Sequence, residues 1–136
     1  MATGRRADLK VRVGIDAVGV DRLRRLVEGD EHRQETLFTP RELAYCRRKR
    51  RQYEHMAARF AAKEAVLKAF GTGISQRMRW TDVEVTNDSS GRPRIRLDGA
   101  VATFAERHGL EDLDVSLTHT EGLAFAQAVT VWAEDR

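Results

Sequence analysis

Residues 53–70, YEHMAARFAAKEAVLKAF, form the most regular segment of this 136-residue chain. Its larger side chains recur at helical spacing, at Met56, Phe60, Lys63, Leu67 and Phe70. Gly71 follows directly, and a glycine is a common helix stop because it adopts the left-handed conformation without strain. The pattern predicts a helix over residues 53–70 whose apolar positions build much of the core.

Upstream of this helix, the sequence predicts a strand and two shorter helices. Residues 11–18 read VRVGIDAV, in which apolar residues alternate with other types, as in a half-buried strand. Asp21 is expected to cap a basic amphipathic helix. Residues 39–42, TPRE, combine an N-cap threonine, a proline at the first helical position and a glutamate for a capping box.

Downstream of residue 70, the pattern changes. The elements predicted there are a hairpin, a helix and a second hairpin, over residues 80–97, 100–108 and 115–131. This order predicts an α+β fold, in which a small, mainly antiparallel sheet packs with helices in a single domain of residues 1–136. Residues 1–12 are expected to be a flexible N-terminal extension.

Composition excludes several classes of protein. Apolar residues make up 41% of the chain, and no run approaches the roughly eighteen apolar residues of a membrane helix. The N-terminus lacks the apolar core of a secretory signal, so a cytoplasmic location is expected. The single cysteine, Cys46, excludes an internal disulfide framework, and the four scattered histidines form no zinc motif. Any bound metal is therefore expected to be a hard ion with oxygen ligands.

Positive charge is concentrated in the first part of the chain. Residues 1–60 hold fifteen Lys or Arg against nine Asp or Glu, whereas residues 61–136 hold nine against twelve, so the net charges are +6 and −3. A nucleic-acid-binding module is the competing interpretation, supported by five consecutive cations at 47–51. That interpretation explains the cations but gives no purpose to the acidic residues considered next.

Three features interrupt the structural pattern: Asp16 within an apolar strand, Glu64 within an apolar helix, and the cations at 47–51. Each feature also has a purely structural explanation. Asp16 can lie at a strand end where its side chain reaches water, and Glu64 can form an i, i+4 pair with Lys68. The cations at 47–51 can form a solvated helix end. If the features share one site, its two carboxylates would suit Mg²⁺, which keeps several waters and binds substrate phosphates. Lys68 lies one turn from Glu64 on the same helix face, so it is a better phosphate ligand than Lys63.

Four sequence blocks together resemble a known family. The chain carries GID at 14–16 and, 44 residues after Asp16, FAAKEAVLK at 60–68, followed by GTGI at 71–74 and VSLTHT at 115–120. The combination resembles the signature of the 4′-phosphopantetheinyl transferase superfamily and, more closely, of its small holo-(acyl-carrier-protein) synthase type. These blocks span most of the chain.

The resemblance implies a magnesium-dependent enzyme. Such an enzyme transfers the 4′-phosphopantetheine group of coenzyme A to a serine of an apo acyl carrier protein and releases adenosine 3′,5′-bisphosphate. On the motif match, Asp16, Glu64 and Lys68 are the catalytic residues, and Asp16 and Glu64 are the Mg²⁺ ligands. Lys68 would hold phosphate oxygens. Either Glu64 or a metal-bound water that it orients would accept the serine proton.

The resemblance also implies ligands of coenzyme A along the chain. They are Arg47, Arg48 and Lys49, as candidates for the 3′-phosphate, and Arg59, Lys63, Lys68, Gly71, Thr72, Gly73 and His119 for other parts of the coenzyme. Two of them have structural alternatives. Gly71 can be a plain helix cap, and His119 can be a buried histidine with a satisfied hydrogen bond.

The expected macromolecular partners are an acidic acyl carrier protein and further copies of this chain. The basic helix after Asp16 is the predicted docking surface, through Arg22, Arg24 and Arg25, of which Arg22 best matches the family's docking position. Small members of the family are trimers with active sites between subunits, so a homotrimer is expected. Neither a membrane nor nucleic acid is an expected partner. Tyr45 has no role on this resemblance.

Overall fold

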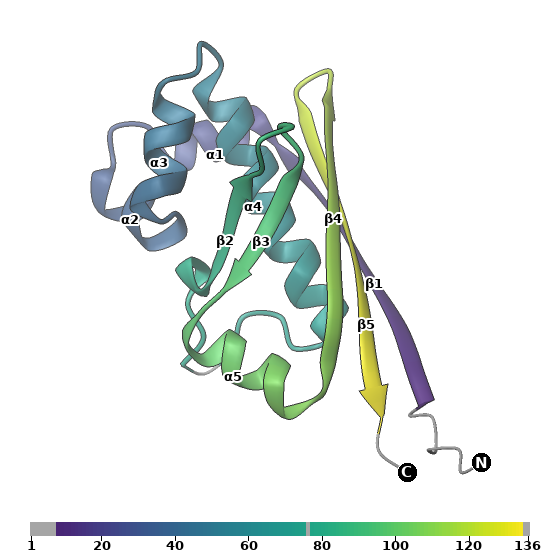
Figure 1. Cartoon of the computed structure of the whole chain (residues 1–136). Coiled ribbons are helices and arrows are strands. Elements are labelled where there is room, and N and C mark those ends of the chain that lie inside the picture. Colours follow the sequence, from purple (N-terminus) through teal and green to yellow (C-terminus); the bar gives the residue numbers. More distant parts are fainter. Residues whose placement is uncertain (1–7, 76, 135–136) are drawn as a thin grey trace, which may run out of the picture.

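The chain folds into helices packed around two antiparallel sheets (Figure 1), and the computed structural model describes residues 8–75 and 77–134. In chain order the elements are β1 (Asp8–Gly19), α1 (Val20–Val27), α2 (Glu31–Leu37), α3 (Pro40–Arg47), α4 (Gln52–Phe70), the 3₁₀ turn η1 (Trp80–Asp82), β2 (Val83–Asn87), β3 (Pro93–Leu97), α5 (Gly99–Arg107), β4 (Leu110–Thr120) and β5 (Leu123–Glu134). The helix predicted over 53–70 and both hairpins are confirmed.

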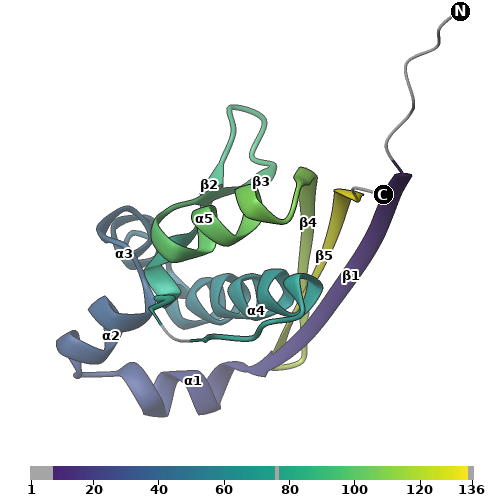
Figure 2. The same ribbon diagram turned by 90° about the horizontal axis from the view of Figure 1, so that it is seen from below.

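The larger sheet has the strand order β1-β5-β4, and β2 and β3 form a separate hairpin. Helix α4 packs against β1 and β5 on one face of the larger sheet and contacts β2 on its other side (Figure 2). Helices α1 and α3 also contact α4. The prediction of an α+β fold with a small antiparallel sheet is therefore confirmed.

Helix α4 is central to the core because other elements cover it on several sides. Along one part of the helix, Val66 packs in a cluster with Trp132 of β5. Nearer its N-terminus, Met56 packs in a second cluster with Leu23 of α1 and Phe38, which follows α2. The apolar residues of α4 thus contribute to two adjoining hydrophobic clusters, and this one helix holds both in place.

Gly14 allows β1 and α4 to approach each other closely. A Cβ atom at this position would overlap the Ala65 carbonyl oxygen and lie 2.7 Å from the Ala69 backbone nitrogen. Only a residue without a side chain fits there, since both neighbours belong to the backbone of a packed helix. The contact brings the next part of β1, including Asp16, alongside α4.

The structure corrects two expectations about element boundaries. Strand β1 begins at Asp8, so residues 8–12 belong to the sheet and not to a flexible extension; residues 1–7 lie outside the described part. Helix α1 begins at Val20 with Gly19 as its N-cap, so Asp21 lies in the first turn and does not cap it.

Helix α2 was not predicted, because its polar sequence shows little apolar periodicity. Its N-cap is Asp30, whose carboxylate accepts a hydrogen bond from the Arg33 backbone. Within the described residues, no helix combines the length and hydropathy needed to cross a membrane.

We expect Gly14→Ala to lower the free energy of unfolding by at least about 2 kcal/mol, because β1 must move away from α4 to admit the methyl group. Gly19→Ala is the matched control. Its added Cβ would meet only an ordinary contact, 3.6 Å from Arg22 Cβ, so its cost should stay below about 1 kcal/mol. Urea unfolding of both variants measures the difference, and equal losses would contradict the close-contact explanation.

Candidate active site

Asp16, Glu64 and Lys68 lie together where β1 crosses α4. Lys68 Nζ donates hydrogen bonds to Asp16 Oδ1, at 2.9 Å, and to the Ile15 carbonyl oxygen, at 3.0 Å. Asp16 and Glu64 both line a cavity of about 330 Å³, together with Arg22 of α1. The structure thus brings together the three predicted catalytic residues, from a strand and a helix that are far apart in sequence.

The electrostatics of this cavity suit a hard divalent cation. Partial burial raises the pKa of Glu64, and the nearby charge of Asp16 raises it further, while Lys68 opposes the shift. A divalent cation between the carboxylates would relieve this repulsion. In residues 8–75 and 77–134, no cluster of three or more His, Cys, Asp or Glu side chains could hold a metal. Two carboxylates fit Mg²⁺, which takes its remaining ligands from water and phosphate.

Lys63 is a structural residue, and its prediction as a coenzyme A ligand is wrong. Its side chain is fully buried, and Nζ donates to Glu42 Oε1, at 2.7 Å, and to the carbonyl oxygens of Trp80 and Val83. Glu42 also accepts hydrogen bonds from the backbone nitrogens of Thr39 and Val85. The ammonium therefore ties α4 to α3 and β2, with no exposed surface left for a ligand.

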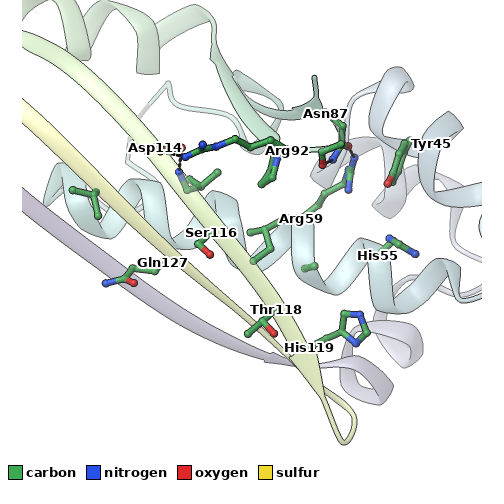
Figure 3. A pocket seen from close by; sticks show the side chains of 16 residues that line it. Tyr45, His55, Arg59, Asn87, Arg92, Asp114, Ser116, Thr118, His119 and Gln127 are labelled. Atoms are coloured by element: carbon green, nitrogen blue, oxygen red, sulfur yellow. Dashed lines mark hydrogen bonds and ion pairs between the residues drawn. The ribbon is translucent and has the colours of Figure 1, made fainter. Parts of the chain in front are cut away.

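A second cavity, of about 500 Å³, lies between α4 and the β2–β3 hairpin and extends along β4 (Figure 3). Arg59 of α4 is its buried cation, only 3% exposed. Its Nη2 donates to Asn87 Oδ1 at 2.7 Å, its guanidinium carbon lies 4.0 Å from the centroid of the Tyr45 ring, and its Nε has no hydrogen-bond partner. No acidic side chain of the described residues forms an ion pair with Arg59, so its charge is available to an anionic ligand.

His119 extends from the end of β4 into this second cavity (Figure 3). Its side chain is 52% exposed, so the alternative of a buried structural histidine is wrong. His119 Nδ1 lies 2.7 Å from Glu54 Oε1, which leaves Nε2 as the ring nitrogen for a ligand. Nearby, burial lowers the pKa of His55, and the charges of Arg59 and Lys49 lower it further.

The three cations predicted for the 3′-phosphate take different positions. Arg47 Nη2 donates to Gln34 Oε1 at 2.6 Å, so Arg47 is engaged with α2, away from the second cavity. Arg48 caps the C-terminus of α3. Lys49 is not a lining residue of the cavity, but its Nζ lies 4.7 Å from the centroid of the Tyr45 ring, which is one. The geometry therefore favours Lys49 over Arg47 as a phosphate ligand.

The segment 71–73 lines neither of these two cavities. Gly71 is the left-handed C-cap of α4, with φ 80°, which confirms the structural alternative. Gly73 also has positive φ, and Thr72 Oγ1 donates to its carbonyl oxygen.

Of the predicted docking residues, Arg22 lines the cavity with Asp16 and Glu64. Arg24 pairs with Glu28 at 2.8 Å, and Arg25 is exposed on α1. All three lie on one short helix beside the acidic pair.

Sequence reasoning missed four residues that shape these sites. Glu42 was identified only as part of a capping box, Tyr45 had no assigned role, and Glu54 and Asn87 were not singled out. The capping box at Glu42 exists, since its carboxylate accepts from the Thr39 backbone while Thr39 Oγ1 accepts from the Glu42 backbone. Because the capping box already explained Glu42, its second role as the partner of Lys63 was not predicted.

Comparison with known proteins gives consistent results. The model of the 4′-phosphopantetheinyl transferase superfamily matches residues 12–127. A holo-[acyl-carrier-protein] synthase of Geobacter sulfurreducens is 47% identical over 117 residues, covering 85% of this chain and 93% of that protein. One from Solibacter usitatus is 43% identical over 121 residues, covering 88% and 96%. The solved ACPS–CoA complex of Chronobacterium ammoniagenes has a TM-score of 0.82 at 26% identity, covering 92% of this chain and 99% of that one.

We expect Lys63→Met to lower the free energy of unfolding by about 3 kcal/mol, because the buried carboxylate of Glu42 would lose its counter-charge. Lys68→Met is the control, since the half-exposed pair with Asp16 should contribute less than about 1 kcal/mol. Thermal and urea unfolding check the contrast. A Lys63→Met protein as stable as the unmodified chain would contradict the assigned structural role.

Proposed function

The chain belongs to the 4′-phosphopantetheinyl transferase superfamily, as an enzyme of the holo-(acyl-carrier-protein) synthase type, and from this premise we propose its reaction. It transfers the 4′-phosphopantetheine group from coenzyme A to a serine hydroxyl of an apo acyl carrier protein. The serine oxygen bonds to the phosphorus that bears the pantetheine arm, and the bond from that phosphorus to the bridging pyrophosphate oxygen breaks. The serine proton passes to a base, and adenosine 3′,5′-bisphosphate leaves.

The observation that carries this proposal is the meeting of Asp16 and Glu64 at one cavity, with Lys68 paired to Asp16 at 2.9 Å. Asp16 and Glu64 would hold Mg²⁺, which would neutralise pyrophosphate charge and make the attacked phosphorus more electrophilic. Lys68, whose side chain is 52% exposed beside Asp16, would bind a phosphate oxygen. Glu64, or a water that it orients, would accept the serine proton. These roles are those of positioning and charge neutralisation that phosphoryl transfer requires.

The second cavity is proposed to bind the nucleotide end of coenzyme A. Its support is the buried guanidinium of Arg59, which lacks an acidic partner among the described residues and so calls for an anion from outside the chain. His119 lines the same cavity, and Lys49 contacts the ring of the lining residue Tyr45, so both would add to the binding of phosphate. These basic groups suit a phosphate, because the N–H donors of an arginine match the geometry of phosphate oxygens.

Two copies of the chain are proposed to complete each active site, within a homotrimer. The acidic cavity and the nucleotide cavity share no lining residue. Glu64 and Arg59 are five positions apart on α4, which places them about 140° apart around the helix. One coenzyme must reach both groups, and a neighbouring copy can bring the second cavity to the first.

An uncovered apolar face supports such an assembly. On the face of β1 that points away from α4, Leu9, Val11, Val13 and Ile15 are each more than half exposed. Val129 of β5 pairs with Val13 and extends this patch. Contiguous exposed apolar surface of this kind is typical of a protein interface.

The acidic carrier protein is proposed to dock on α1. Arg22 lies at the cavity that holds Asp16 and Glu64, and Arg25 is exposed on the same helix. A carrier bound there would present its serine next to the acidic pair. Opposite charges would steer the encounter and weaken with salt.

We expect Glu64→Gln to reduce transfer more than about a hundredfold, because the amide is a poor ligand for Mg²⁺ and a poor base. Intact-mass spectrometry of an apo acyl carrier protein with coenzyme A and Mg²⁺ measures the product. The unmodified enzyme should add one phosphopantetheine, and a chelator should prevent it. Glu111→Gln, at an exposed site on β4, should retain full activity.

The experiment distinguishes a wrong role for Glu64 from a wrong reaction. Full activity of Glu64→Gln would remove Glu64 from the metal site while leaving the transferase reaction intact. Absence of any mass gain with the unmodified enzyme, over several carrier proteins, would contradict the proposed reaction itself.

A further inference from the structure

Tyr45 of α3 lines the nucleotide cavity, and its ring contacts three basic side chains. The guanidinium carbon of Arg59 lies 4.0 Å from the centroid of the ring, and Lys49 Nζ lies 4.7 Å from it. The imidazole of His55 packs edge-on, with ring centroids 5.8 Å apart and planes at 77°. Figure 3 shows Tyr45, His55 and Arg59 around the same cavity. Groups from α4 and from the turn after α3 thus meet at one aromatic ring.

The aromatic ring holds these cations without neutralising them. Like charges repel, so Arg59 and Lys49 need an attractive partner to remain near each other, and the negative face of the ring supplies one. A carboxylate at the position of the ring would accept hydrogen bonds from the N–H groups of Arg59 and Lys49 and would neutralise their charge. The ring accepts none of these donors: among the described residues, the hydrogen bond that Arg59 donates in this cavity goes to Asn87, and its Nε has no partner. The donors therefore remain for an anionic ligand.

The chemistry of coenzyme A indicates which of its phosphate groups binds in this cavity. This step rests on the proposed function. The pyrophosphate belongs with Asp16, Glu64 and Lys68. In the Tyr45 cavity the acidic lining residue is Asp114, which is already paired with Arg92 at 2.6 Å. Among the described residues that line this cavity, no carboxylate is therefore free to bind a metal, and the cavity suits a phosphate that binds without one. The remaining phosphate of coenzyme A is the one on the ribose 3′-oxygen.

We propose that Tyr45 is a positioning residue that holds Arg59 and Lys49 for the 3′-phosphate of coenzyme A. It acts through these two cations, and its own hydroxyl has no part in the contact. The role is a specificity-determining one, because it acts on the phosphate that distinguishes coenzyme A from dephospho-coenzyme A.

The test compares steady-state kinetics with these two substrates in Tyr45→Leu and in the matched control Tyr45→Phe, which keeps the ring. Tyr45→Leu should raise the KM for coenzyme A about tenfold, the range of a partly buried cation–π contact. Its kcat, and its KM for dephospho-coenzyme A, should not change. Tyr45→Phe should resemble the unmodified enzyme with both substrates. Lys49→Ala, at an exposed position, should show the same selective loss without a risk to folding.

Two results would overturn the proposal. An equal rise in KM for both substrates would indicate a general packing role for Tyr45, and an unchanged KM for coenzyme A would remove the ring from the site. If the unmodified enzyme transferred nothing, the proposed function would fail separately. Calorimetric binding of adenosine 3′,5′-bisphosphate and adenosine 5′-monophosphate would then decide, since Tyr45→Leu should lose the preference for the bisphosphate and an intact preference would contradict the inference.

Discussion

The close contact between β1 and α4 at Gly14 is the constraint on which the acidic site depends. The backbones lie so near that a Cβ at Gly14 would overlap the Ala65 carbonyl oxygen. Because Asp16 follows two residues later on the same side of the strand, it lies within 2.9 Å of Lys68 on the helix. The positions of Asp16 and Glu64 are thus set by backbone packing between a strand and a helix. These elements hold the two side chains more rigidly than a loop would.

Helix α4 carries different chemistry on different faces. Glu64 and Lys68 face β1, Lys63 is buried against Glu42, and Arg59 lies beneath the nucleotide cavity. The buried Lys63–Glu42 pair fixes the helix between the two sites, so neither can shift without breaking a desolvated ion pair. On the proposed function, this arrangement leaves each chain with two half-sites on separate flanks. The apolar outer face of β1 offers the surface through which copies could join them.

Much of the fold, and the acidic pair, could be predicted from sequence, whereas contacts between helices could not. The periodicity of residues 53–70 predicted α4, and Asp16 and Glu64 stood out because each is an acid within an apolar pattern. Lys63 was misassigned because its partner, Glu42, lies 21 residues away and already had a local role in a capping box. The Tyr45 contacts with Arg59 and Lys49 also depend on how α3 packs against α4, which no spacing encodes.

The most direct test of this account is subunit complementation. Glu64→Gln disables the acidic half-site and Arg59→Met the nucleotide half-site, so each protein alone should be nearly inactive when coenzyme A is kept well below the KM of Arg59→Met. When the two are co-expressed in equal amounts, random assembly should place an intact acidic half beside an intact nucleotide half at one site in four, restoring about a quarter of the unmodified activity. A mixture as inactive as its parents would show that one chain supplies both halves, and would contradict a site shared between copies.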